Sequence, residues 1–122
     1  MRAVLWKGKN TFAVGEVKRP VIGPKQILVS VKAASICTSD FHYADFNCVP
    51  PLVPGHEVAG VVVETGRKVK QIRKGQRVAL DPVQRCGKCV CCTAGISHLC
   101  LNTRHLGYSA APGGWAEFVA ID

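Results

Sequence analysis

Short apolar stretches, separated by turn-forming residues, run through most of this chain. Four of them are rich in valine, isoleucine and alanine and partly alternate with polar residues, a pattern that predicts β-strands. These four stretches are 27–36, 58–65, 77–80 and 116–121. Prolines and glycines recur between them at close spacing, and they exclude long helices through most of the chain. We therefore predict an all-β barrel or sandwich.

The only stretch that suits a helix is 39–46, where Ser39 or Asp40 can cap a first turn. The chain has 122 residues, of which 48% are hydrophobic and 20% charged. This length and composition predict one globular domain with a modest core. No Gly-x-Gly-x-x-Gly sequence is present, so the residues give no sign of a dinucleotide site.

The formal net charge of +8 raises the question of a nucleic-acid partner. Six lysines and arginines lie between Arg67 and Arg77. However, no aromatic side chain is interleaved with them, and Val69 and Ile72 interrupt the run. A solvated basic face is the favoured interpretation, and we predict no nucleic-acid partner.

Seven cysteines are present, and four of them have the spacing of metal ligands. Cys86, Cys89, Cys92 and Cys100 follow the pattern Cys-x2-Cys-x2-Cys-x7-Cys. Two-residue gaps let successive sulfurs converge on one ion, and four thiolates suit a closed structural zinc site. Unligated or redox-active thiols are the alternative. Cys91 lies inside the cluster as a competing ligand.

Cysteines grouped for metal binding favour a reducing compartment, and Cys48, which has no spacing partner, is interpreted as a small buried residue. The first apolar run, 3–6, is too short for a signal peptide. No stretch approaches the length that spans a membrane. We therefore expect a cytoplasmic protein without a membrane partner.

A second candidate metal site consists of Cys37, His56 and Glu57. Their spacing alone is weak evidence, and by itself it favours a hydrogen-bonded loop histidine at position 56 and allows a solvated glutamate at position 57. His56 and Glu57 follow Pro54-Gly55 and open a predicted strand, a position where a rigid scaffold can hold ligands. Two or three ligands would leave an open zinc position, which can polarise an alcohol oxygen.

Several motifs together resemble the zinc-containing alcohol dehydrogenases of the medium-chain dehydrogenase/reductase superfamily. The motifs are Gly55-His56-Glu57-x2-Gly60-x5-Gly66-x2-Val69, Cys37-Thr-Ser-Asp-Phe-His42, the four-cysteine loop, 74–82 and 113–118. They occur in the family's order and cover essentially the whole chain. The resemblance implies a GroES-like β-barrel that oxidises an alcohol to a carbonyl, with NAD or NADP as hydride acceptor.

The resemblance also implies ligands for a catalytic zinc. Cys37 and His56 would bind the ion, with Glu57 as a nearby or alternating ligand. Asp40 would hydrogen-bond the ring nitrogen of His56 that faces away from the metal.

A proton relay and a cofactor contact are implied in the same way. Ser39 would take the proton of the substrate hydroxyl and begin a relay that ends near His42. Thr38 stands where many relatives carry glycine or a basic residue near the cofactor phosphates. Without the resemblance, Ser39 and Asp40 are equally a helix cap, and His42 is an exposed histidine. Trp115 and Glu117 are interpreted as packing and strand residues.

In the resembling family a Rossmann domain follows this barrel, binds the nicotinamide cofactor and completes the zinc site, and residues 1–122 contain none of it. We therefore expect residues 1–122 to be an incomplete catalytic domain that does not turn over alcohol alone. An uncovered barrel edge would favour self-association, for example as a homo-oligomer.

The competing function is a non-catalytic, zinc-stabilised GroES-like binding module. A nucleic-acid zinc finger would need a recognition helix after the cysteines, which 101–114 does not supply.

Overall fold

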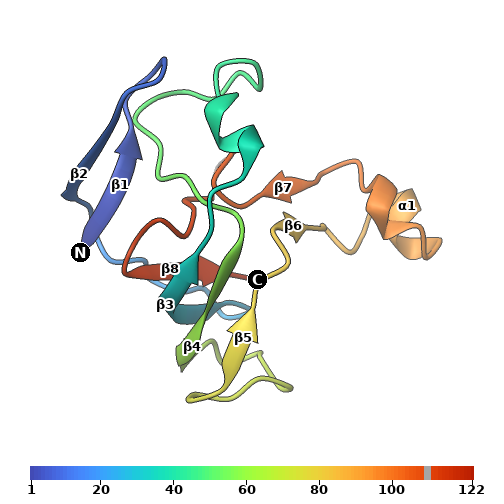
Figure 1. The fold of residues 1–122 in the computed structure, drawn as a ribbon. Coiled ribbons are helices and arrows are strands. Elements are labelled where there is room, and N and C mark those ends of the chain that lie inside the picture. The colour runs from blue at the N-terminus through green and yellow to red at the C-terminus, as the bar shows by residue number, and fades with distance from the viewer. Residues whose placement is uncertain (109–110) are drawn as a thin grey trace.

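The computed structural model describes residues 1–108 and 111–122, and its regular elements are mostly short β-strands (Figure 1). The strands are β1 Arg2–Trp6, β2 Phe12–Glu16, β3 Ile27–Ala34, β4 Val58–Thr65, β5 Arg77–Ala79, β6 Val83–Gln84, β7 Arg104–His105 and β8 Phe118–Ile121. The helices are η1 Thr38–Phe41, α1 Val90–Thr93 and η2 Ser97–Leu99. None of the helices in the described part of the chain is long and apolar enough to cross a membrane.

A four-stranded antiparallel sheet in the order β5-β4-β3-β8 forms the centre of the molecule. Its strands are the four that the apolar pattern predicts, although three are shorter than predicted: β3 ends at Ala34, β5 ends at Ala79 and β8 begins at Phe118. The core on this sheet is formed by Ile27, Val29, Val58, Val62, Leu106, Val119 and Ile121. These side chains are branched and apolar, so strand pairing and burial favour the same fold.

The hairpin β1–β2 packs beside this sheet and is absent from the sequence-based prediction. Ala3 and Trp6 of β1 are buried, whereas β2 is largely exposed, which explains why its strand pattern is weak. The Trp6 indole Nε1–H donates to the carbonyl oxygen of Lys9 in the connecting turn at 2.6 Å. Backbone hydrogen bonds from Val4 to Trp115 and between Trp6 and Leu52 join β1 to the rest of the domain.

The predicted helix at 39–46 is only a single 3-10 turn, η1, followed by turns. Cys37 occupies the N-cap position, and the Asp40 carboxylate accepts a hydrogen bond from the Cys37 backbone N–H at 2.8 Å. Asp40 therefore satisfies the N-terminal end of the helix from inside the first turn, as in a capping box. Ser39 does not cap it, so its hydroxyl is available for other contacts.

The short pair β6–β7 carries a lobe that contains α1 and η2 and projects away from the sheet (Figure 1). Four of its apolar side chains are exposed, namely Val90, Ile96, Leu99 and Leu101. The lobe therefore buries little apolar surface of its own, and another interaction must hold it together.

Candidate metal centres

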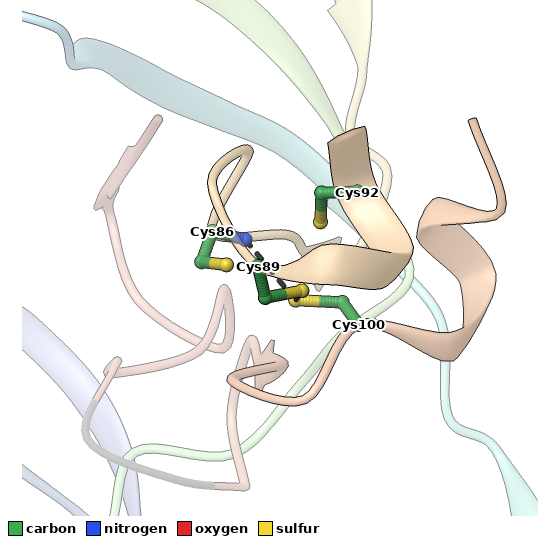
Figure 2. Close-up of side chains that lie close together, drawn as sticks. All are labelled: Cys86, Cys89, Cys92 and Cys100. Atoms are coloured by element: carbon green, nitrogen blue, oxygen red, sulfur yellow. Dashed lines mark hydrogen bonds between the residues drawn. The ribbon is translucent and has the colours of Figure 1, made fainter. Parts of the chain in front are cut away.

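The lobe brings together the four cysteines whose spacing predicts a structural metal site. One sulfur from each of Cys86, Cys89, Cys92 and Cys100 lies within 4.8 Å of all the others. Figure 2 shows their side chains converging between α1 and the neighbouring loops. The sulfurs of Cys89 and Cys100 are 3.9 Å apart. Thiolates about 2.3 Å from a tetrahedral zinc ion are separated by about 3.8 Å, so the donor set fits zinc. Cys91 is outside this group.

Backbone N–H groups around the cysteines favour charged sulfur. Hydrogen bonds from the backbone N–H groups of Lys88 and Cys89 lower the pKa of Cys86 to about 6. The Cys100 sulfur accepts hydrogen bonds from the backbone N–H groups of Cys86 at 3.3 Å and Asn102 at 3.4 Å. In contrast, partial burial and the neighbouring thiols raise the pKa of Cys92 to about 12. Four thiolates therefore need a counter-charge at this position, which a divalent ion supplies.

The second group combines residues from two separate segments. Ligand atoms of Cys37, at the start of η1, and of His56 and Glu57, before β4, lie within 4.8 Å of one another. One thiol, one imidazole and one carboxylate are a donor set that zinc accepts with a coordination position left open. The Ser35 hydroxyl donates to the Glu57 carboxylate, which is otherwise exposed.

A buried carboxylate lies directly behind His56. Asp40 is fully buried, and its Oδ1 is 3.2 Å from His56 Nδ1, although the pair does not form a regular hydrogen bond. The Tyr43 hydroxyl donates to the same Oδ1 at 2.5 Å. Burial, together with this hydrogen bond to Asp40, raises the pKa of Tyr43 far above its ordinary value, so the phenol remains a donor. This carboxylate beside Nδ1 leaves Nε2 of His56 as the nitrogen available to a metal.

A cavity of about 450 Å³ lies next to His56. It is lined by Ser39, Phe46, His56, Pro82, His105 and Tyr108. Most of this lining is apolar or aromatic, and the hydroxyls of Ser39 and Tyr108 add polar atoms. A cavity of this kind suits a small organic molecule with one polar group.

Two of the other predicted site residues lie at the surface. Thr38 is exposed at the first position of η1. The His42 side chain is 53% exposed, and its Nδ1 is 2.8 Å from Asp45 Oδ2. His42 is outside the described lining of the cavity. Tyr108, which the sequence-based prediction omits, is the residue that contacts the Ser39 hydroxyl.

Three other residues, which their sequence context predicts to be structural, make the following contacts, although Glu117 lies just before β8 and Cys48 is less buried than predicted. Glu117 forms an ion pair with Arg2 of β1, and the Trp115 indole donates to the carbonyl oxygen of Ser35 at 3.1 Å. Cys48 is half-buried, and burial raises the pKa of its thiol.

The fold is that of a small β domain that carries two groups of potential metal ligands. The chain belongs to the alcohol dehydrogenase GroES-like domain family, whose model matches residues 23–122. This confirms both the family resemblance and the mainly β fold that the sequence predicts. It is 42% identical over 112 residues, 87% of this chain, to an L-threonine 3-dehydrogenase of Symbiobacterium thermophilum. It is 38% identical over 121 residues, 95% of this chain, to an alcohol dehydrogenase of Geobacillus stearothermophilus.

Solved structures give the same result. The alcohol dehydrogenase TADH of Thermus sp. ATN1 superposes on 99% of this chain with a TM-score of 0.91 and 32% identity, and 37% of that chain is covered. A protein described as a zinc-binding dehydrogenase of Sinorhizobium meliloti 1021, with NADP bound, superposes on 98% of this chain with a TM-score of 0.88 and 39% identity, and 35% of that chain is covered. The chain spans about a third of the length of the curated relatives, 32% of the first and 35% of the second.

Proposed function

We propose that this chain forms the alcohol-binding catalytic domain of a zinc-dependent dehydrogenase, which oxidises an alcohol to an aldehyde or ketone and passes a hydride to NAD or NADP. The observation that carries the proposal is the meeting of Cys37, His56 and Glu57 beside a cavity that Ser39 lines. A zinc ion bound there would act as a Lewis acid and lower the pKa of the alcohol. A purely structural module has no need of such an open donor set, which favours catalysis over the binding-module alternative.

The residues around this donor group have distinct tasks in the proposal. Cys37 and His56 would hold the metal, and Glu57, which accepts a hydrogen bond from the Ser35 hydroxyl, would be a third or alternating ligand. Asp40 orients His56 through its contact with Nδ1. This arrangement resembles other metal-binding histidines, whose second ring nitrogen is oriented by a carboxylate.

In the proposal, proton transfer begins at Ser39, which lines the cavity, and ends at His42, which is exposed. Ser39 accepts the proton of the substrate hydroxyl at the cavity wall and gives up its own hydroxyl proton to a relay that ends near His42. His42 releases a proton to solvent, and its 53% exposure and its contact with Asp45 suit that task. Thr38, exposed at the start of η1, lies beside the cofactor phosphates in this proposal.

Apart from Thr38, the cofactor-binding residues in this proposal come from outside residues 1–122, because this sequence has no dinucleotide fingerprint. We therefore propose that the isolated chain does not oxidise alcohols. Formation of NADH or NADPH from an alcohol by the pure chain would contradict this part of the proposal.

The central sheet ends in the edge strands β5 and β8, and we include self-association through one of these edges in the proposal. A single monomer peak at high concentration in size-exclusion chromatography would count against it.

Zinc counting tests the donor group itself. The purified chain is dialysed against zinc and its zinc content is measured by elemental analysis for the wild type, His56→Ala and His105→Ala. We expect two zinc ions per chain for the wild type and His105→Ala, and one for His56→Ala, because His105 lines the same cavity but is outside the donor group. Equal zinc content in all three proteins would refute the second metal centre.

A further inference from the structure

Tyr108 contacts Ser39, the residue that accepts the proton of the substrate hydroxyl in the proposed function. Tyr108 itself has no role in that proposal. The Tyr108 hydroxyl donates to Ser39 Oγ at 2.6 Å, across 69 positions of sequence. Both residues line the cavity together with His56. A hydrogen bond between two side chains at a cavity wall fixes the direction of both hydroxyls.

The Tyr108 ring is itself held in place by three neighbouring rings. Its centroid is 4.9 Å from that of Tyr43, 5.5 Å from that of Phe46 and 5.2 Å from that of His56. The Cys48 thiol also donates to the Tyr108 carbonyl oxygen at 3.0 Å. Aromatic packing of this kind limits the ring to one orientation, so the phenol oxygen has a defined position.

This position determines what the Ser39 hydroxyl can still do. A serine hydroxyl has one hydrogen to donate and two lone pairs that accept. Tyr108 occupies one lone pair, which leaves the Ser39 hydrogen and the second lone pair for a molecule in the cavity. Without the tyrosine hydroxyl, the Ser39 side chain would be free to populate other staggered rotamers.

We propose that Tyr108 is a positioning residue that directs the Ser39 hydroxyl at the oxygen of an alcohol bound in the cavity. This inference rests on the proposed function, in which Ser39 contacts that oxygen. Tyr108 acts through Ser39 and takes no proton itself. Burial raises the pKa of its phenol, which therefore remains a donor near neutral pH.

The first test measures the Ser39 side-chain rotamer in the purified chain by three-bond NMR couplings. We expect one dominant rotamer in the wild type and an averaged coupling in Tyr108→Phe. Tyr43→Phe is the matched control, because it removes a hydroxyl of the same aromatic cluster that is bonded to Asp40 instead of Ser39. It should leave the coupling unchanged. Identical couplings in the wild type and Tyr108→Phe, or an equal change in both variants, would overturn the proposal.

The second test measures the affinity for trifluoroethanol by fluorine NMR in the wild type, Tyr108→Phe, Ser39→Ala and the double variant. We expect Tyr108→Phe to bind about fivefold more weakly, the equivalent of one hydrogen bond, with no further loss in the Ser39→Ala background. An equal loss in both backgrounds would assign the effect to ring packing and overturn the proposal. A wild-type chain that does not bind trifluoroethanol would contradict the proposed function, whereas the rotamer measurement decides the Tyr108 inference separately.

Discussion

The four-cysteine group takes all its ligands from the single connection between β6 and β7, whereas the Cys37–His56–Glu57 group joins the two ends of the connection between the paired strands β3 and β4. The first lies in a projecting lobe with exposed apolar side chains, and the second lies beside a cavity with the buried Asp40 behind it. A closed group of four thiols can support a lobe that has almost no core. The open group depends instead on the sheet that brings its ligands together.

The largest expected effect comes from removing one thiolate of the closed group. Cys89→Ser should lose the zinc of the lobe and the protection of the amides between Cys86 and Cys100. The reason is that binding of a structural zinc supplies about 10–16 kcal/mol in small metal domains. Elemental analysis and amide hydrogen exchange are the measurements.

Cys91→Ser is the matched control for this prediction, because Cys91 lies in the same loop and outside the group of four. It should retain the zinc and the protected amides. If Cys91→Ser also lost the metal, Cys91 would have to be counted among the ligands, and the closed tetrahedral group would be wrong.

The second-largest expected effect comes from replacing one glycine near each ligand group by alanine. Gly55 precedes His56 with φ +93°, and a Cβ atom there would lie 2.3 Å from Trp115 Cδ1 and 2.8 Å from the Trp115 backbone nitrogen. Gly95, in the cysteine lobe, has φ +80° and nothing within 4 Å of such a Cβ. Gly55→Ala should lower the free energy of unfolding by about 3 kcal/mol, and Gly95→Ala by about 1 kcal/mol.

Urea unfolding followed by tryptophan fluorescence measures both glycine variants. Equal losses of stability would mean that the lobe is packed as tightly as the sheet, contrary to the comparison. Zinc content provides a second readout, because Gly55→Ala should weaken the open group and Gly95→Ala should not affect it.

The difference between the two ligand groups also explains which parts of the structure can be predicted from the sequence. The four-cysteine group is predicted from spacing because its ligands are close in sequence and geometry follows from short gaps. The four strands of the central sheet are predicted from their branched apolar residues. The hairpin β1–β2 is not predicted, because β2 is mostly exposed and has no clear alternation of buried positions.

The open group is different, because its parts meet only through the fold. Cys37 follows β3 and His56 precedes β4, so they lie near opposite ends of the connection between these strands, and only the family resemblance suggests that they lie together. The contact between Tyr108 and Ser39 crosses 69 positions, and nothing in either local sequence indicates it. For Asp40 the sequence leaves two roles open, a helix cap and a partner for His56. In the structure its carboxylate does both, because it accepts a hydrogen bond from the Cys37 backbone N–H and contacts His56 Nδ1.

The smallest expected effect concerns the polar anchor at the base of the lobe. The Arg85 guanidinium donates to Asp81 Oδ2 at 2.7 Å, and this hydrogen bond holds the pKa of Asp81 below its usual value. A carboxyl with a lowered pKa stabilises the folded state above its unfolded pKa of about 3.9, and this contribution is lost as the pH falls through the lower folded value. Asp81→Asn should therefore cost less than about 1 kcal/mol at pH 7, since the pair is exposed, and progressively less as the pH falls below the unfolded pKa.

Urea unfolding of the wild type and Asp81→Asn at several pH values between 7 and 2 tests this last prediction. The difference between the two proteins should shrink steadily below pH 4, and both should retain the zinc of the lobe at pH 7. A loss of several kcal/mol at pH 7, or a loss of zinc there, would show that the ion pair supports the lobe as strongly as the thiolates do. The lobe would then depend on contacts outside the four-cysteine group, as the open group depends on the sheet. The proposed difference between the two metal centres would be wrong.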